Sequence, residues 1–441
     1  MKAIKILLKI LITAIILAGA YPVAIISTFI IINIPIYEKF SQPLLSVYSY
    51  LVIVFFGVSI FYLFSALLRG RWHNLSEKDI LCKFMPFFAI ATASFFFHLN
   101  SYPTGVQMGI FQLAKWAEIP FACFIAANVL NSKLKIRITL NLYLVATFFI
   151  ALVCIKLYFT DISTIDAHSR LSFGFHPNTV AAAINTILPL CIGMLVGSRN
   201  FLKKMLALVT STMLFYLLFR THSRSAMVSL VVLLVIWFIT LTAQKRISVA
   251  FIVILLVSGF LLWLFEHSTK FSTRFNVFSP TKLFANMQTR LILYAEALIL
   301  AIKNPLLGVG PGLHGLLIKK TGVIIEETRF LPIMQAHSIY FQVLAETGFI
   351  GMFFFLRFLV HIFKRIKQAF SVIAEDRYYY IIGTSMILSI VIFALHNLTD
   401  ITLRSGIGLQ IGINLGIFLA IFRIVSKQSQ RKEGAPNALN P

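Results

Sequence analysis

Charged residues are scarce in this chain: they make up 12% of its 441 residues, about half the share that is usual in soluble domains. Acidic residues are the rarer sign, with 15 Asp and Glu against 39 Lys and Arg, and the formal net charge is +24. So little charge in so apolar a chain excludes a disordered protein and a nucleic-acid-binding domain. The four cysteines lie in or beside apolar segments without metal or redox spacing, so a disulfide scaffold is excluded as well.

Several catalytic and nucleotide-binding motifs are also missing. The sequence contains no G-x-x-x-x-G-K-[ST], no H-E-x-x-H, no Asp-x-Asp and no His/Cys cluster. These absences argue against a metal-dependent nucleotide-sugar transferase, and we expect neither a metal site nor a cofactor. The stretch 308–312 (GVGPG) lacks the strand-then-helix context of a dinucleotide-binding fold, so we interpret it as a tight turn.

Apolar residues are abundant instead: they form 59% of the chain, and its mean hydropathy is +0.89. A membrane-spanning helix needs about 20 apolar residues, whereas the strands of a membrane β-barrel would alternate in hydrophobicity. The sequence therefore predicts an all-α polytopic membrane protein with about twelve spans. These are 7–34, 46–68, 80–98, 109–131, 138–159, 177–197, 204–219, 225–243, 247–265, 338–363, 378–396 and 403–423.

The positive charges predict the orientation of these spans. With the N-terminus inside, the inner segments carry 23 Lys and Arg and the short outer segments carry five. Cytoplasmic loops of membrane proteins hold the excess of Lys and Arg. We therefore expect both termini in the cytoplasm and the opposite loops outside it.

One outer connection, 267–337, is much longer than the others. Connections this long are usually functional. Its segment 290–303 (RLILYAEALILAIK) is amphipathic at helical period and predicts a helix against the membrane surface, ended by the Asn-Pro pair that follows. The predicted organisation is spans one to nine in 1–266, a partly helical periplasmic loop in 267–337, spans ten to twelve in 338–425, and a cytoplasmic tail in 426–441.

Arginine dominates the basic residues of the outer face, where positive charge opposes the orientation rule. The guanidinium group binds phosphate oxygens two at a time, so outer arginines could converge on a diphosphate. The alternative is that they are anchors at the membrane interface. The candidates are Arg170, Arg220, Arg224, Arg290 and Arg404.

Two further polar residues flank spans at the outer boundary. His337 precedes the tenth span, where an imidazole could exchange a proton near neutral pH; a hydrogen-bonded boundary histidine is the alternative. Asp400 lies close to Arg404 and could orient an arginine or a sugar hydroxyl, or simply cap a helix.

Four stretches resemble the O-antigen ligase/polymerase superfamily, and together they extend over roughly residues 165–405. They are 304–312 (NPLLGVGPG), 337–351 (HSIYFQVLAETGFIG), 223–226 (SRSA) and 170–174 (RLSFG), of which the last is similar to O-antigen ligases in particular. The order of these stretches around a large outer loop is the specific part of the resemblance. Where this chain has Ser338, the family often has Asn.

The resemblance implies a GT-C-like all-helical glycosyltransferase of the bacterial inner membrane with a periplasmic site. Its donor would be an undecaprenyl-diphosphate-linked polysaccharide and its acceptor a sugar of lipid A-core, with no nucleic acid as partner. By position, the family's essential Arg, Arg and His correspond to Arg224, Arg290 and His337. The candidates for substrate binding are Arg170, Arg220, Asp400 and Arg404.

The residues suit an inverting, metal-independent transfer in which arginines bind the diphosphate and His337 acts as general base. Two related activities stay open as alternatives. One is an O-antigen polymerase, which joins the same donor to another lipid-linked glycan, and the other is a protein O-oligosaccharyltransferase. A transporter or flippase is the alternative of a different class. It would show broken helices at the membrane midplane and two similar halves, and the sequence shows neither.

Overall fold

The structure is a computed structural model of the full chain. It describes residues 68, 75–99, 105–160, 171, 177–223, 225–230, 280–317, 336–373, 376–401, 403 and 407–433. The described part is helical, which confirms the all-α expectation. Its helices are α4 (Lys78–His98), α5 (Val106–Val129), α6 (Lys133–Thr160), α7 (Pro177–Gly197), α8 (Phe201–Arg220), α12 (Pro280–Lys303), α13 (His314–Leu317), α14 (Ile339–Ile373), α15 (Arg377–Thr399) and α16 (Ile407–Glu433).

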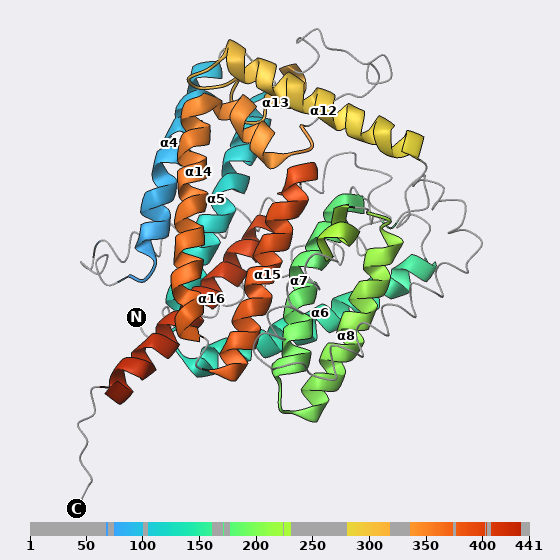
Figure 1. Cartoon of the computed structure of the whole chain (residues 1–441), viewed down its shortest axis with the longest axis vertical. Coiled ribbons are helices and arrows are strands. Elements are labelled where there is room, and N and C mark those ends of the chain that lie inside the picture. Colours follow the sequence, from blue (N-terminus) through green and yellow to red (C-terminus); the bar gives the residue numbers. More distant parts are fainter. Residues whose placement is uncertain are drawn as a thin grey trace, which may run out of the picture.

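Eight of these helices are long and apolar enough to cross a membrane, and each coincides with a predicted span. They are α4 to α8 and α14 to α16, so the chain is a multi-pass membrane protein. The other four predicted spans, 7–34, 46–68, 225–243 and 247–265, lie wholly or largely outside the described residues. Figure 1 shows the bundle with the start of α14 and the end of α15 toward its upper end.

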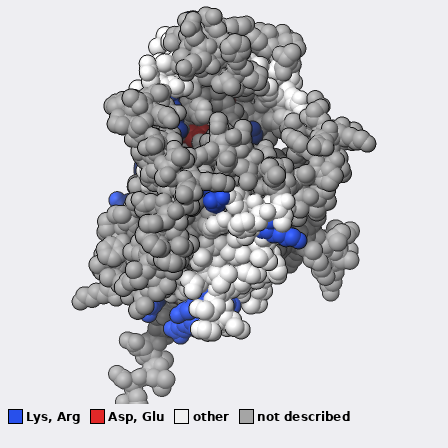
Figure 2. Space-filling model, turned by 90° about the vertical axis from the view of Figure 1, so that its right-hand side faces the viewer, with Lys and Arg blue, Asp and Glu red and all other residues white. Residues whose placement is uncertain are grey.

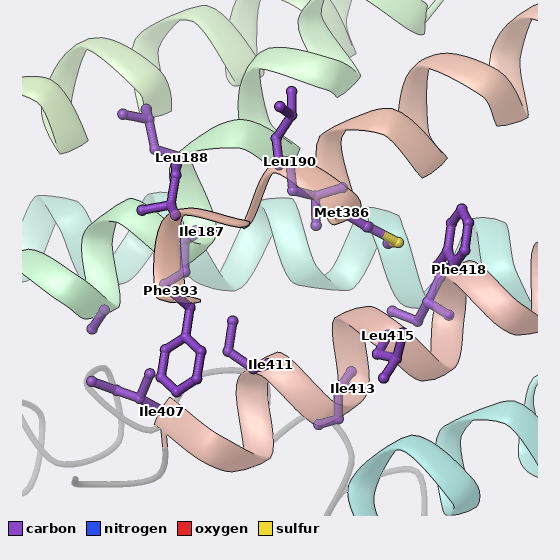
Figure 3. Packing of buried hydrophobic residues seen from close by; sticks show 14 of the residues in the cluster. Ile187, Leu188, Leu190, Met386, Phe393, Ile407, Ile411, Ile413, Leu415 and Phe418 are labelled. Atoms are coloured by element: carbon purple, nitrogen blue, oxygen red, sulfur yellow. The ribbon is translucent and has the colours of Figure 1, made fainter. Parts of the chain in front are cut away.

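The centre of the bundle is formed by α7, α15 and α16. In α7 89% of the most apolar window is buried, whereas α4, α6 and α8 bury less than 40% of theirs and expose apolar side chains around the bundle. Figure 3 shows how Ile187 of α7, Phe393 of α15 and Ile411 of α16 meet in this core. Because a bilayer solvates apolar side chains, the outer helices need no polar outer face.

Polar side chains fasten the same three helices within the core. Ser389 of α15 and Asn414 of α16 both donate hydrogen bonds to the carbonyl oxygen of Thr186 in α7, at 2.5 and 3.3 Å, and Asn414 also donates to Ser389 at 2.9 Å. Polar groups inside a membrane protein need such internal partners. This network fixes how α15 packs against α7.

The turn at 304–312 fits into a bend in α14. At Gly348 the backbone has φ 66° and ψ −171°, a conformation open mainly to glycine, so the helix is interrupted there. The amide of Val309 donates to the carbonyl oxygen of Ala345 at 2.9 Å, which joins the turn to the segment before the bend. The structure thus confirms a tight turn at 308–312 and shows that it supports the first turns of α14.

Helix α12 lies across the upper end of the bundle (Figure 1). It includes the helix predicted over 290–303, begins earlier at Pro280 and ends at Lys303, directly before the Asn-Pro pair. Ala297 and Leu300 on one side are buried in a small apolar cluster with Ala336 and Ile401, while Leu291 on another side is exposed. An exposed apolar side on a helix across the end of the bundle fits contact with the membrane surface.

Candidate functional site

An imidazole and a carboxylate from two different spans meet at the upper end of the bundle. His337 lies two residues before the start of α14, Asp400 directly follows α15, and Nδ1 of His337 lies 3.3 Å from Oδ1 of Asp400. The side chain of Asp400 is 9% exposed, whereas that of His337 is 38% exposed. With the Nδ1 proton assigned to the bond with Asp400, Nε2 is left as the basic atom of the ring, and enough of the ring is exposed to meet a substrate.

Asp400 is held as an ionised acceptor. Asn178, in the first turn of α7, donates a short hydrogen bond to Oδ2, and the amide of Ile401 donates to Oδ1 at 2.8 Å. Burial alone would raise the pKa of Asp400, but the hydrogen bonds from His337 and Asn178 and the histidine charge outweigh it and hold this pKa well below its usual range. The ionised form therefore stabilises the fold above pH about 4, and this contribution is lost as the pH falls below that.

The backbone at His337, just before the start of α14, has an uncommon conformation. Its φ is 47°, in the left-handed region that few residues other than glycine adopt. The hydroxyl of Tyr294 donates to the carbonyl oxygen of Leu398 at 2.9 Å and lies 3.4 Å from the carbonyl oxygen of His337. One tyrosine of α12 thus joins the segment that carries His337 to the end of α15 that carries Asp400.

Arg290 belongs to the same region through α12. It stands one helical turn before Tyr294, whose ring stacks on Phe341 of α14 with the centroids 4.5 Å apart. Burial raises the pKa of Tyr294, the charge of Arg290 lowers it and that of Asp400 raises it. Tyr294 therefore lies within electrostatic reach of both charges.

A second histidine lies beside the first pair. His396 is buried one helical turn before Asp400, and its Nε2 lies 2.9 Å from the hydroxyl oxygen of Ser225. The segment 223–226, singled out in the sequence for its arginine, therefore reaches the site through its serine.

Of the four remaining predicted arginines, the structure describes only Arg220. The guanidinium group of Arg220, at the end of α8, lies 4.5 Å from the ring centroid of Tyr158 at the end of α6. Its carbonyl oxygen accepts the amide of Leu171 at 2.8 Å, which connects this helix end to the segment after Arg170. Three predicted residues lie outside the described part of the chain: Arg170, Arg224 and Arg404.

Four polar residues of this region were not predicted: Asn178, Ser225, Tyr294 and His396. Two of them had a signal in the sequence, since His396 stands four residues before Asp400 and Tyr294 stands four residues after Arg290. On a helix such pairs share one face. Ser225 lies in the stretch 223–226 that was noted for its resemblance, but nothing in that stretch indicated its partner His396. Asn178 had no signal, because it lies at the start of a helix far along the chain from Asp400.

This arrangement offers a base, its orienting carboxylate and a nearby cation, which together suit proton removal beside a developing negative charge. Among the residues that the structure describes, no three His, Cys, Asp or Glu side chains gather as metal ligands would. The metal-independent reaction expected from the sequence stays a prediction.

The fold and the site define an all-helical, multi-pass membrane protein with an ionisable cluster at one end of its bundle. Residues 206–356, about a third of the chain, match the family model described as O-antigen ligase, which confirms the resemblance found in the sequence for that segment. The matched family supports a glycosyltransferase of the O-antigen ligase and polymerase type. The match includes Arg290 and His337 but not Asp400, and no curated protein matches the chain.

Proposed function

We propose that the protein is an O-antigen ligase. It transfers O-antigen polysaccharide from undecaprenyl diphosphate to lipid A-core at the periplasmic face of the inner membrane, and its termini face the cytoplasm. The observation that supports this most is the His337–Asp400 pair at one end of a membrane-spanning bundle, in a chain matched by the O-antigen ligase family model. The partners are the lipid-linked donor, the lipid A-core acceptor and the surrounding lipids.

In the proposed reaction, Nε2 of His337 accepts the proton of an acceptor hydroxyl as that oxygen attacks the anomeric carbon of the donor. The new glycosidic bond forms while the bond from the anomeric carbon to the diphosphate breaks, and the diphosphate departs with the electron pair. Attack opposite the leaving group inverts the anomeric carbon. Asp400 holds the imidazole with its proton on Nδ1 and stabilises the imidazolium that forms. The donor supplies the energy of transfer.

The leaving diphosphate gathers negative charge, and arginines are proposed to stabilise it. Among these arginines, Arg290 is the one that the structure describes near His337, since it stands one helical turn before Tyr294, whose hydroxyl contacts the carbonyl oxygen of His337. Arg224, Arg170, Arg220 and Arg404 are proposed to complete the binding of the donor. Fixed cations at a developing charge perform the task that a metal ion performs in other transferases.

Replacing Arg290 tests this role. If the guanidinium group binds the diphosphate with two parallel hydrogen bonds, Arg290→Lys should lower transfer nearly as much as Arg290→Ala, because an ammonium group lacks the planar pair of donors. The measurement is the rate of transfer to lipid A-core in reconstituted membranes. Lys303→Ala, at the exposed end of the same helix, is the matched control and should transfer normally. Full activity of Arg290→Lys would show that charge alone suffices.

The cell's lipopolysaccharide profile without this gene tests the function itself. A ligase predicts the loss of all long polysaccharide bands together with an accumulation of lipid-linked polymer, and the plasmid-borne gene should restore the bands. A band with a single repeat unit would instead assign the protein as an O-antigen polymerase. An unchanged profile with a loss of glycan on secreted or pilin-like proteins would assign a protein O-oligosaccharyltransferase, and accumulation of donor on the cytoplasmic side would assign a flippase.

A further inference from the structure

A large cavity opens at the lower end of the bundle, opposite the His337–Asp400 site. Its volume is about 1000 Å³. Among the lining residues that the structure describes, Asp376 is the only acidic one, whereas six are cationic, and we call this cavity the basic pocket. These six are Lys133, Arg137, Arg199, Lys203, Lys204 and Arg377. Figure 2, viewed from the right-hand side of Figure 1, shows Lys and Arg side chains gathered at the lower end of the molecule.

The cations of the basic pocket come from helices that are far apart in the sequence. Lys133 begins α6, Lys203 lies in the first turn of α8, and Arg377 begins α15. Three helix N-termini thus meet at this cavity, and each adds a partial positive charge to that of the side chains. An orientation signal for membrane insertion needs basic residues in the loops but does not require them to converge on one cavity.

The carboxylate of Asp376 is already engaged in the fold. Oδ1 of Asp376 accepts the amides of Tyr378 and Tyr379 as the N-cap of α15, at 3.1 and 3.3 Å. Its Oδ2 lies 3.8 Å from Nζ of Lys133, in an ion pair with both side chains about one-third exposed. A single shared carboxylate leaves the pocket strongly positive, which favours an anion with more than one charge.

Apolar side chains stand beside these cations and face outward. Phe201 and Leu202, directly before Lys203, are 70% and 76% exposed, and Leu134 next to Lys133 is 67% exposed. In a membrane-spanning bundle, exposed apolar residues at the end of the spans mark the depth at which acyl chains give way to headgroups. The basic pocket therefore lies where a lipid phosphate would be placed while its acyl chains run along α6 and α8.

We propose that the basic pocket binds the phosphate groups of an anionic phospholipid on the membrane surface opposite the His337–Asp400 site. Basic pockets between transmembrane helices are suited to phosphate-bearing headgroups, and the volume and the number of cations favour a headgroup with two phosphates, such as that of cardiolipin. The bound lipid joins the lower ends of α6, α8 and α15. Since α15 carries Asp400 at its other end, the lipid helps to hold the helix on which the site depends.

The test uses the purified full chain in a neutral detergent and measures its thermal unfolding with three additions. Cardiolipin should raise the melting temperature by several degrees, and phosphatidylglycerol should raise it less. Inorganic pyrophosphate distinguishes a soluble anion from a lipid and should give little shift at the same phosphate concentration. A shift with pyrophosphate and none with either lipid would overturn the proposal.

Two matched variants locate the effect. Lys203→Gln/Lys204→Gln removes two cations of the pocket and should weaken the apparent affinity for cardiolipin about 10- to 30-fold, since each cation contributes to the attraction of an anionic headgroup. Lys364→Gln/Lys367→Gln removes two exposed charges from α14 at the same lower end of the bundle but outside the pocket, and should leave the affinity unchanged. An equal loss in both variants would show that only net charge matters and would overturn the site.

Discussion

Replacing His337 by asparagine or by alanine is expected to abolish glycosyl transfer. Removing a general base typically costs about 10²–10⁴-fold in rate, and Nε2 of His337 is the atom proposed to accept the acceptor's proton. The loss should appear in kcat, with the KM for the lipid-linked donor little changed, because the imidazole acts on the acceptor. The measurement is transfer to lipid A-core in reconstituted membranes, together with the amount of protein inserted.

The asparagine variant makes this experiment discriminating. His337 has a φ of 47°, and asparagine adopts that conformation more readily than alanine, so His337→Asn separates the loss of the base from backbone strain. His361→Ala, which removes a partly buried imidazole from the middle of α14, is the matched control and should transfer normally. Transfer by His337→Asn at the wild-type rate, or a change confined to the donor KM, would show that His337 is not the base.

Asp400→Asn should lower transfer by a similar factor of about 10²–10⁴, although Asp400 does not touch the reacting atoms. Asparagine keeps the size of the side chain but loses the charge that stabilises the imidazolium, and its amide can reverse the hydrogen bond to Nδ1. The acid limb of the pH–activity profile should also move to lower pH, because the protonated imidazole loses its stabilising charge.

The pH profile distinguishes a positioning role from a structural one. A variant that merely unfolds the end of α15 would lower the amount of active protein without moving the profile. Asp79→Asn, in the exposed first turn of α4 at the other end of the bundle, is the matched control and should leave rate and profile unchanged. A profile that stays in place in Asp400→Asn, with the rate reduced, would show that the carboxylate supports the fold and not the base.

Composition and hydrophobic periodicity predicted the membrane-spanning helices and the amphipathic helix. The ends of the eight described spans were predicted within five residues, because a bilayer demands about 20 apolar residues and the loops between them are short and polar. The exception is α14, which ends at Ile373, ten residues beyond the predicted end at 363. The amphipathic segment 290–303 and its stop were predicted for the same reason: both are local features. The earlier start of α12 was missed, since 280–289 carries no clear apolar period.

Individual site residues were predicted, whereas their partners were not. The position of His337 and Asp400 at the ends of spans follows from the span boundaries, but their contact joins the start of α14 to the end of α15 across 63 positions. Asn178 donates to Asp400 although the two residues are 222 positions apart in the sequence. No pattern within α7 or α15 predicts which faces of these two helices pack together. The same holds for the basic pocket, whose cations were predicted as an orientation signal and not as a cavity.

The sequence by itself determined that this chain crosses a membrane repeatedly, which of its segments do so, and which ends carry the polar residues, because transfer of apolar helices into a bilayer depends on each segment alone. Only the tertiary structure decided which polar residues become neighbours. That choice depends on how helices pack side by side, through the bend at Gly348, the contacts of α7, α15 and α16 and the placement of α12, and such contacts join residues that are remote in the chain.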